Sequence, residues 1–117
     1  MTAQTRSAEQ RSTTRYQLYR PVRLHRFHPS QIIETLTKDL SAGGLRCLSA
    51  SAISVSTELS IELTLSTGGA PISATGRTVW FRTIPHSDQM DLGIAFTGFS
   101  GDDARRLSAY LEHMAQV

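Results

Sequence analysis

Strict alternation of apolar and polar positions is the clearest pattern along this chain. In residues 59–65, leucine and isoleucine occupy every second position, with serine, glutamate and threonine between them. Residues 90–97 repeat the pattern, with apolar side chains at every second position from Met90 to Phe96. Because successive side chains of a strand point to opposite faces, both segments are predicted to be strands with one buried face. Four further extended segments are expected at residues 15–27, 31–37, 45–48 and 72–83.

The apolar spacing changes near the C-terminus, where Ala104, Leu107, Leu111 and Met114 recur at helical intervals. Residues 100–103, Ser-Gly-Asp-Asp, supply an N-cap candidate and acids for the first turn of this predicted helix. About six short strands followed by one helix indicate a mainly β fold. The pattern fits a small antiparallel barrel or sandwich, with the helix packed on one opening or face.

The N-terminal segment differs in composition from the rest of the chain. Residues 1–14 are polar and lack periodicity, which predicts a flexible arm. The remaining residues, 15–117, have the size and patterning of one domain, and no internal repeat is visible.

The charge balance is nearly neutral overall, yet the cations gather at one end. Twelve Lys and Arg residues oppose ten Asp and Glu residues, and Lys38 is the only lysine. Six arginines fall within residues 1–26, where Glu9 is the only acid. Arginine binds phosphate and planar acceptors with two parallel hydrogen bonds and stacks on flat rings, which favours an anionic, nucleotide-like partner. The alternative is that these arginines simply face solvent.

Several classes of protein are disfavoured by what the sequence contains. Cys47 is the only cysteine, so neither an internal disulfide nor a four-cysteine metal site is expected. His25 and His28 would point to opposite faces of a strand, so a shared metal is not expected either. No apolar run reaches the ~20 residues of a membrane span, and the N-terminus is polar, which predicts a cytoplasmic protein. No nucleophile, base or phosphate-binding loop pattern indicates an enzyme.

Two short motifs are the candidates for ligand binding. Arg11 and Arg15 form Arg-x-x-x-Arg where the arm meets the first strand. Asp39, Ser41 and Gly44 form Asp-x-Ser-x-x-Gly, predicted to lie in the turn between the second and third strands. Each motif has an ordinary explanation alone, because the first arises by chance in an arginine-rich arm and the second is a good generic turn.

The two motifs together, in this order, resemble the PilZ domain family. Residues 76–81 (GRTVWF) and 92–96 (LGIAF), followed by the capped helix, are similar to the later part of that family, so the resemblance covers roughly residues 11–114. It implies a six-stranded antiparallel β-barrel with a flexible N-terminal arm and a C-terminal helix. It also implies that the paired motifs bind the bacterial second messenger cyclic di-GMP.

Cyclic di-GMP carries two phosphates and two guanines, and the motif residues suit both groups. Arginine can bind guanine O6 and N7, stack on the purine or clamp a phosphate. Asp39 can accept from the guanine donor edge, and Ser41 can donate to a phosphate or to N7. Gly44 permits close backbone approach or a positive φ. Trp80, the only tryptophan, is a candidate for a secondary contact by stacking, with a core or half-buried role as the alternative.

The expected function is that of a standalone cyclic di-GMP receptor that senses its ligand without consuming it and needs no cofactor. Binding would change the arm and signal to a partner protein in motility, adhesion or exopolysaccharide production, as the resemblance implies. One alternative is a small basic barrel that binds RNA or single-stranded DNA, although only 7% of residues are aromatic. Another is a PilZ-like protein-interaction module that is indifferent to nucleotide. The sequence leaves the oligomeric state open.

Overall fold

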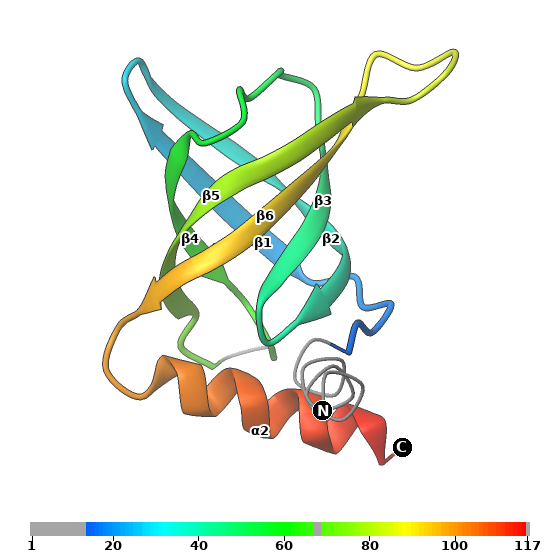
Figure 1. The fold of residues 1–117 in the computed structure, drawn as a ribbon. Coiled ribbons are helices and arrows are strands. Elements are labelled where there is room, and N and C mark those ends of the chain that lie inside the picture. The colour runs from blue at the N-terminus through cyan, green and yellow to red at the C-terminus, as the bar shows by residue number, and fades with distance from the viewer. Residues whose placement is uncertain (1–13, 67–68, 117) are drawn as a thin grey trace, which may run out of the picture.

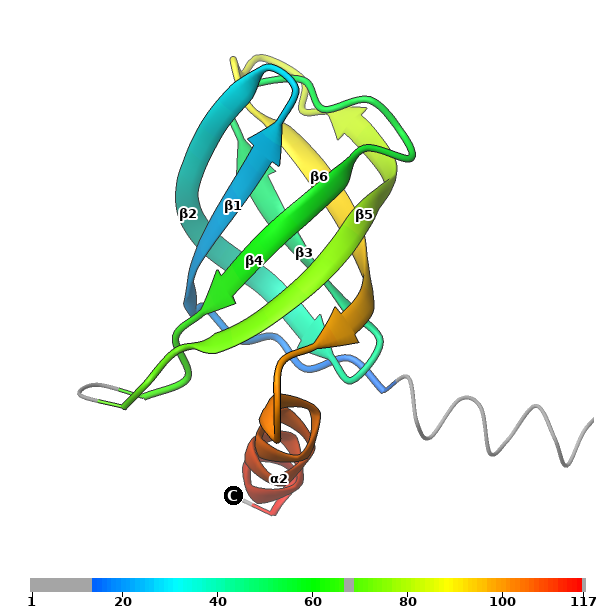
Figure 2. The ribbon, with the colours of Figure 1, turned by 90° about the vertical axis from the view of Figure 1, so that its left-hand side faces the viewer.

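Six antiparallel strands form a closed barrel in the computed structural model, which describes residues 14–66 and 69–116. Around the barrel the strands follow the order β1-β2-β3-β6-β5-β4 (Figures 1 and 2). The mainly β barrel with one C-terminal helix that the sequence predicts is therefore confirmed. The elements are β1 (Pro21–Phe27), β2 (Ser30–Ser41), β3 (Gly44–Ser49), β4 (Glu58–Leu63), β5 (Ile72–Thr83), β6 (Met90–Phe99) and α2 (Asp103–Ala115).

The barrel core is built from the apolar positions of the alternating pattern. In β4, Leu59, Ile61 and Leu63 are buried, while Glu58 and Glu62 face solvent. Leu92 and Ile94 of β6 are buried in the same core. A strand of this kind is stable because one face loses contact with water and the other keeps it.

The end of β2 departs from the sequence prediction. Asp39 to Ser41 were expected in a turn, but β2 continues to Ser41, and only Ala42 and Gly43 separate it from β3. Leu40 is fully buried and pairs with Leu45, so packing and ladder hydrogen bonds outweigh the turn preference of Asp and Ser. Because Asp39 belongs to a strand, its side chain points to the outside of the barrel in a fixed direction. A residue in a turn would not have this fixed direction.

The start of the first strand also differs from the prediction. β1 begins at Pro21 rather than at residue 15, and its first position suits a residue without a backbone N–H. The preceding segment lies beside the second half of β2 and forms one isolated bridge, in which Tyr16 and Leu40 exchange backbone hydrogen bonds of 2.9 and 3.0 Å. This bridge fixes the chain next to the end of β2.

The helix α2 covers one end of the barrel (Figures 1 and 2). Leu107 and Leu111 are buried against the core, as the helical spacing predicts. Asp103 fixes the helix start, because its Oδ2 accepts a hydrogen bond of 2.8 Å from the backbone N–H of Ser73 on β5. Burial and this contact hold the helix against the sheet.

The predicted division into an arm at residues 1–14 and a domain at 15–117 stays a prediction, since residues 1–13 lie outside the described part. Within residues 14–66 and 69–116, no helix has both the length and the apolar character needed to cross a membrane.

Candidate functional site

Four residues on adjacent strands lie directly opposite one another across the outside of the barrel. Asp39 on β2 pairs with Arg46 on β3, Arg46 pairs with Gly93 on β6, and Gly93 pairs with Trp80 on β5. Their sequence neighbours Leu40, Leu45, Leu92 and Ile94 are fully or almost fully buried. These four positions are called the outer row below.

Asp39 is held by two arginines. Arg15 Nη1 donates to Oδ1 at 2.7 Å, and Arg46 Nε donates to Oδ2 at 2.9 Å. The Tyr16–Leu40 bridge brings Arg15 to this position. Arg15 of the first motif and Asp39 of the second are thus in contact, while Arg11, the other predicted arginine, lies outside the described residues. The two motifs meet at one end of the outer row.

Ser41 shapes the turn between β2 and β3 from a buried position. Its Oγ accepts hydrogen bonds of 3.2 Å from the backbone N–H groups of Gly43 and Gly44, and it donates to the Gly44 carbonyl at 3.3 Å. The side chain is therefore engaged by its own turn. Ser41 therefore determines the shape of this turn, and a contact between Ser41 and a ligand would alter that shape.

Gly44 is needed for a close approach between two strands. A Cβ at this position would lie 2.1 Å from the carbonyl oxygen of Ile94 on β6. Gly44 does not have a positive φ, so that part of the sequence argument is wrong. The missing side chain lets the start of β3 lie against β6, directly after the turn that follows β2.

Trp80 lies on the outside of the barrel, not in its core. The side chain is 38% exposed, and its ring covers Gly93, where a Cβ would come within 2.2 Å of Trp80 Cε2. Arg82 Cζ lies 5.9 Å from the ring centroid, within range of a cation–π contact. One side of the indole is thus occupied by the sheet, and the ring keeps accessible surface at the far end of the outer row.

Gly93 was not singled out from the sequence, although a signal was present. It interrupts an apolar run at an outward position of a strand, where a missing side chain allows close approach by another group. That group is the indole ring of Trp80.

Asp91 is a second residue that sequence reasoning missed. It is only 3% exposed, and it binds Lys38 Nζ and Arg82 Nη2, each at 3.0 Å. Arg46 Nη1 lies 3.8 Å away, so Arg46 connects Asp91 to Asp39. Burial would raise the pKa of Asp91, but the hydrogen bonds from Lys38 and Arg82 and the charge of Arg46 outweigh it and hold the pKa below its usual value.

The charges around the outer row do not balance. Two carboxylates, Asp39 and Asp91, are surrounded by four cations that all take part in the ion pairs just described, which leaves two positive charges. The cations are Arg15, Lys38, Arg46 and Arg82. A dianion is the ligand charge that this face complements.

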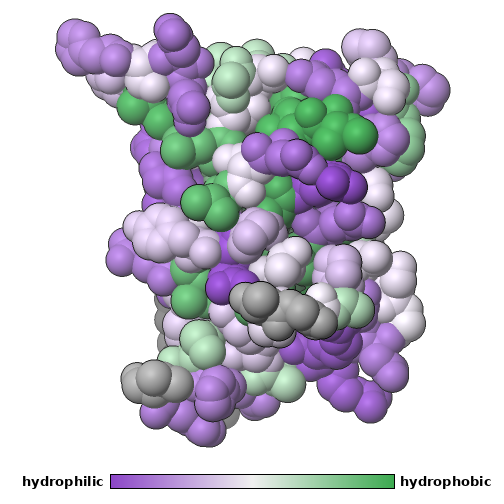
Figure 3. Space-filling view, turned by 180° about the vertical axis from the view of Figure 1, so that it is seen from behind, coloured by the Kyte–Doolittle hydropathy of each residue, from purple (hydrophilic) through white to green (hydrophobic). Residues whose placement is uncertain are grey.

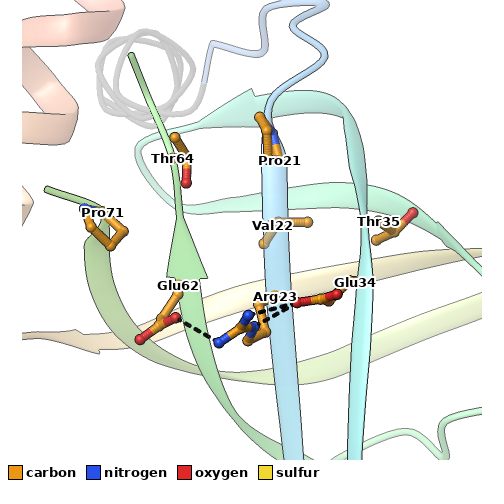
Figure 4. Close-up of a pocket in the computed structure, with 8 residues that line it drawn as sticks. All are labelled: Pro21, Val22, Arg23, Glu34, Thr35, Glu62, Thr64 and Pro71. Carbon is orange, nitrogen blue, oxygen red and sulfur yellow. Dashed lines mark hydrogen bonds and ion pairs between the residues drawn. The ribbon is translucent and has the colours of Figure 1, made fainter. Parts of the chain in front are cut away.

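A groove elsewhere on the barrel is less suitable for an anion. Figure 4 shows Arg23 on β1 between Glu34 and Glu62, which it contacts at 2.6 and 3.6 Å. The acids outnumber the cation there.

The view from behind Figure 1 shows hydrophobic areas separated by hydrophilic ones (Figure 3). Two large apolar side chains are exposed on the neighbouring strands, Phe27 on β1 and Ile32 on β2.

Metal binding and thiol chemistry have little support in the described part of the chain. Within residues 14–66 and 69–116, no three His, Cys, Asp or Glu side chains are placed to hold a metal ion. Cys47 is buried in the core, and burial raises the pKa of its thiol to about 12.

Solved structures share this fold at low sequence identity. The Bacillus subtilis inhibitor of motility (MotI/DgrA) matches with a TM-score of 0.73 and 18% identity, over 89% of this chain and 50% of that chain. The present chain thus spans about half of that protein. The PilZ domain of YcgR from Escherichia coli, solved with cyclic di-GMP, matches with a TM-score of 0.61 and 16% identity, over 83% of this chain and 85% of that one. A search of curated proteins found no match.

The family comparison covers most of the chain. Residues 9–113 match the family described as PilZ domain, a range that includes both motifs, the whole barrel and most of α2. The agreement between this match, the closed barrel and the meeting of the two motifs identifies the chain as a member of the PilZ domain family.

Proposed function

We propose that this chain binds cyclic di-GMP along the outer row and passes the change to a partner protein. The contact between Arg15 and Asp39 carries the proposal, because it brings the two motifs together beside a face with two excess positive charges. Two further findings support it. The chain belongs to a family of ligand-binding adaptor domains, and the E. coli relative of the same fold was solved with cyclic di-GMP.

The proposed roles follow from the chemistry of each side chain. Arg15, together with Arg11 from the preceding segment, clamps guanine and phosphate. Asp39 accepts from the guanine donor edge, which its existing ion pairs permit because a carboxylate has about four acceptor positions. Ser41 and Gly44 hold the turn that contacts the other side of the ligand, and Ser41 can donate to the ligand only by giving up its hydrogen bond to the Gly44 carbonyl. Trp80 offers its exposed ring for stacking.

The proposed output is a change of shape and charge, without chemistry on the ligand. Binding a dianion would neutralise the excess charge and would engage Arg11 of the N-terminal arm together with Arg15, which changes the arm. A cytoplasmic partner in motility, adhesion or exopolysaccharide production would then recognise the altered surface. The name of the B. subtilis relative, inhibitor of motility, favours the first of these processes.

A fluorescence titration tests the proposal against nucleic-acid binding. Trp80 is the only tryptophan, so its emission reports on the proposed site alone. We expect cyclic di-GMP to change this emission and to saturate it, with little effect from single-stranded oligonucleotides. Raising salt from about 50 to about 200 mM weakens binding to many backbone phosphates by a factor of roughly 10³–10⁵, but it weakens binding of a dianion far less. Saturation by oligonucleotide alone would reject the proposal in favour of a nucleic-acid-binding barrel.

A further inference from the structure

Asp91 lies at the convergence of three strands, outside both motifs. Lys38 reaches it from β2, Arg46 from β3 and Arg82 from β5. All three cations come from strands of the outer-row face, and Arg46 contacts Asp39 through a second nitrogen. The carboxylate is therefore a shared anchor for the cations of that face.

The arrangement is poorly explained by stability alone. One cation would neutralise a buried carboxylate, and a buried ion pair is often no more stabilising than apolar residues of the same volume. Here three cations surround Asp91, so the cluster keeps excess positive charge. Keeping several cations close together costs free energy, which an anionic ligand would return by neutralising them.

Asp91 also determines the position of the Arg82 side chain. Its side chain is 66% exposed, yet Nη2 is fixed by Asp91 at 3.0 Å, and Cζ lies 5.9 Å from the centre of the Trp80 ring. A guanidinium has five N–H donors, and Asp91 takes one of them. The remaining donors are available beside the ring on which a guanine would stack. An exposed arginine without this anchor would sample many rotamers and would lose more entropy on binding.

We infer that Asp91 is a positioning residue for nucleotide binding, which acts by fixing Arg82 beside Trp80. The inference rests on the proposed function, since the nucleotide is the ligand that these cations are positioned to meet. It adds to the two motifs a residue that does not itself touch the ligand.

The substitution Asp91→Asn separates positioning from net charge. It removes one negative charge, so simple attraction would tighten the binding of a dianion. Positioning predicts the opposite, a weakening of about tenfold, the factor for one charge-assisted hydrogen bond. The matched control is Asp88→Asn, which makes the same charge change in the exposed turn between β5 and β6. We expect Asp88→Asn to bind cyclic di-GMP as the wild type does, or slightly more tightly.

A double-mutant cycle shows whether Asp91 acts through Arg82. Arg82→Gln alone is expected to weaken binding by a similar factor, and Asp91→Asn should then add less than about twofold. If the losses of affinity in the two single variants multiply in the double variant, the inference is overturned. Unchanged or tighter binding by folded Asp91→Asn would also overturn it. If Asp91→Asn fails to fold, Arg82→Gln decides the matter, because this exposed substitution must still weaken binding by about tenfold.

A measurement without nucleotide distinguishes failure of this inference from failure of the proposed function. Quenching of Trp80 fluorescence by neutral acrylamide should rise equally in Asp91→Asn and Arg82→Gln and stay unchanged in Asp88→Asn. Unchanged quenching in the first two variants would overturn the positioning of Arg82. Absence of binding by the wild type would instead overturn the proposed function, and with it the nucleotide as the ligand that Asp91 serves.

Discussion

Arg15 and Asp39, 24 residues apart in the sequence, form an ion pair in which Arg15 Nη1 lies 2.7 Å from Asp39 Oδ1. Asp39 is the better buried partner, and it also receives Arg46 through its other oxygen. Asp39 thus connects Arg15 of the first motif to Arg46 on β3. The position of Asp39 decides where both guanidinium groups lie at the end of β2.

Replacing Asp39 should therefore weaken ligand binding, because Arg15 and Arg46 would both lose the carboxylate that holds them. We expect Asp39→Ala to weaken cyclic di-GMP binding by at least about tenfold, because it removes the guanine acceptor and releases Arg15 and Arg46. Calorimetric titration measures the change. Glu34→Ala is the control, since it breaks the ion pair with Arg23 in the groove on β1 and β2 and should leave the affinity unaltered. Equal affinity in the two variants would exclude a role for Asp39.

Gly44→Ala is predicted to destabilise the fold. A Cβ 2.1 Å from the Ile94 carbonyl oxygen forces β3 and β6 apart, and overpacking of this kind typically costs about 1–3 kcal/mol. Urea unfolding followed by circular dichroism measures the loss. At Gly43, the nearest atom to an added Cβ is Ser41 Oγ at 4.0 Å, so Gly43→Ala should be nearly neutral. If both variants are equally stable, the strand contact does not explain Gly44.

Gly93→Ala is predicted to displace the Trp80 ring while the barrel stays folded. The added Cβ would lie 2.2 Å from Trp80 Cε2, and the indole is a side chain at the surface that can move. Near-ultraviolet circular dichroism and fluorescence of Trp80 should both change, and nucleotide affinity should fall by about tenfold, within the range of lost base stacking. A changed spectrum with unchanged affinity would show that the ligand does not stack on Trp80.

Cys47 predicts a specific dependence of stability on alkaline pH. Burial raises the pKa of its thiol from 9.0 to about 12, so the folded state holds this proton more tightly than the unfolded state. The resulting stabilisation is present below pH 9.0 and is lost as the pH rises towards about 12.

The stability difference between wild type and Cys47→Ala should accordingly shrink by up to about 1.4 kcal/mol for each pH unit in that window. Urea unfolding at a series of pH values measures it. Stability curves that run parallel across the window would contradict a buried, neutral thiol.

The local pattern of apolar and polar residues was sufficient to predict most of the fold. Alternation in residues 59–65 predicted β4, and the spacing of Leu107 and Leu111 predicted α2, because both patterns reflect burial of one face. The end of β2 was mistaken because Asp39 and Ser41 favour turns locally, while burial of Leu40 and its pairing with Leu45 depend on a distant strand.

The candidate site was predictable only where a motif marks it. Arg15 and Asp39 belong to motifs, and the structure brings them together. Asp91 and Gly93 acquire their roles from the register of β5, β6, β3 and β2, which alternation does not determine. The ion pair between Lys38 and Asp91 joins residues 53 positions apart, beyond any local signal.

The central claim is that the two motifs form a cyclic di-GMP site, and calorimetric titration of the wild type and of Arg15→Ala tests it most directly. We predict saturable heat for the wild type at up to roughly tens of micromolar ligand, and binding at least about tenfold weaker for Arg15→Ala, since a charge-assisted hydrogen bond contributes about 1.5–3 kcal/mol. Absence of heat with the wild type, or equal affinity for the two proteins, would contradict the claim.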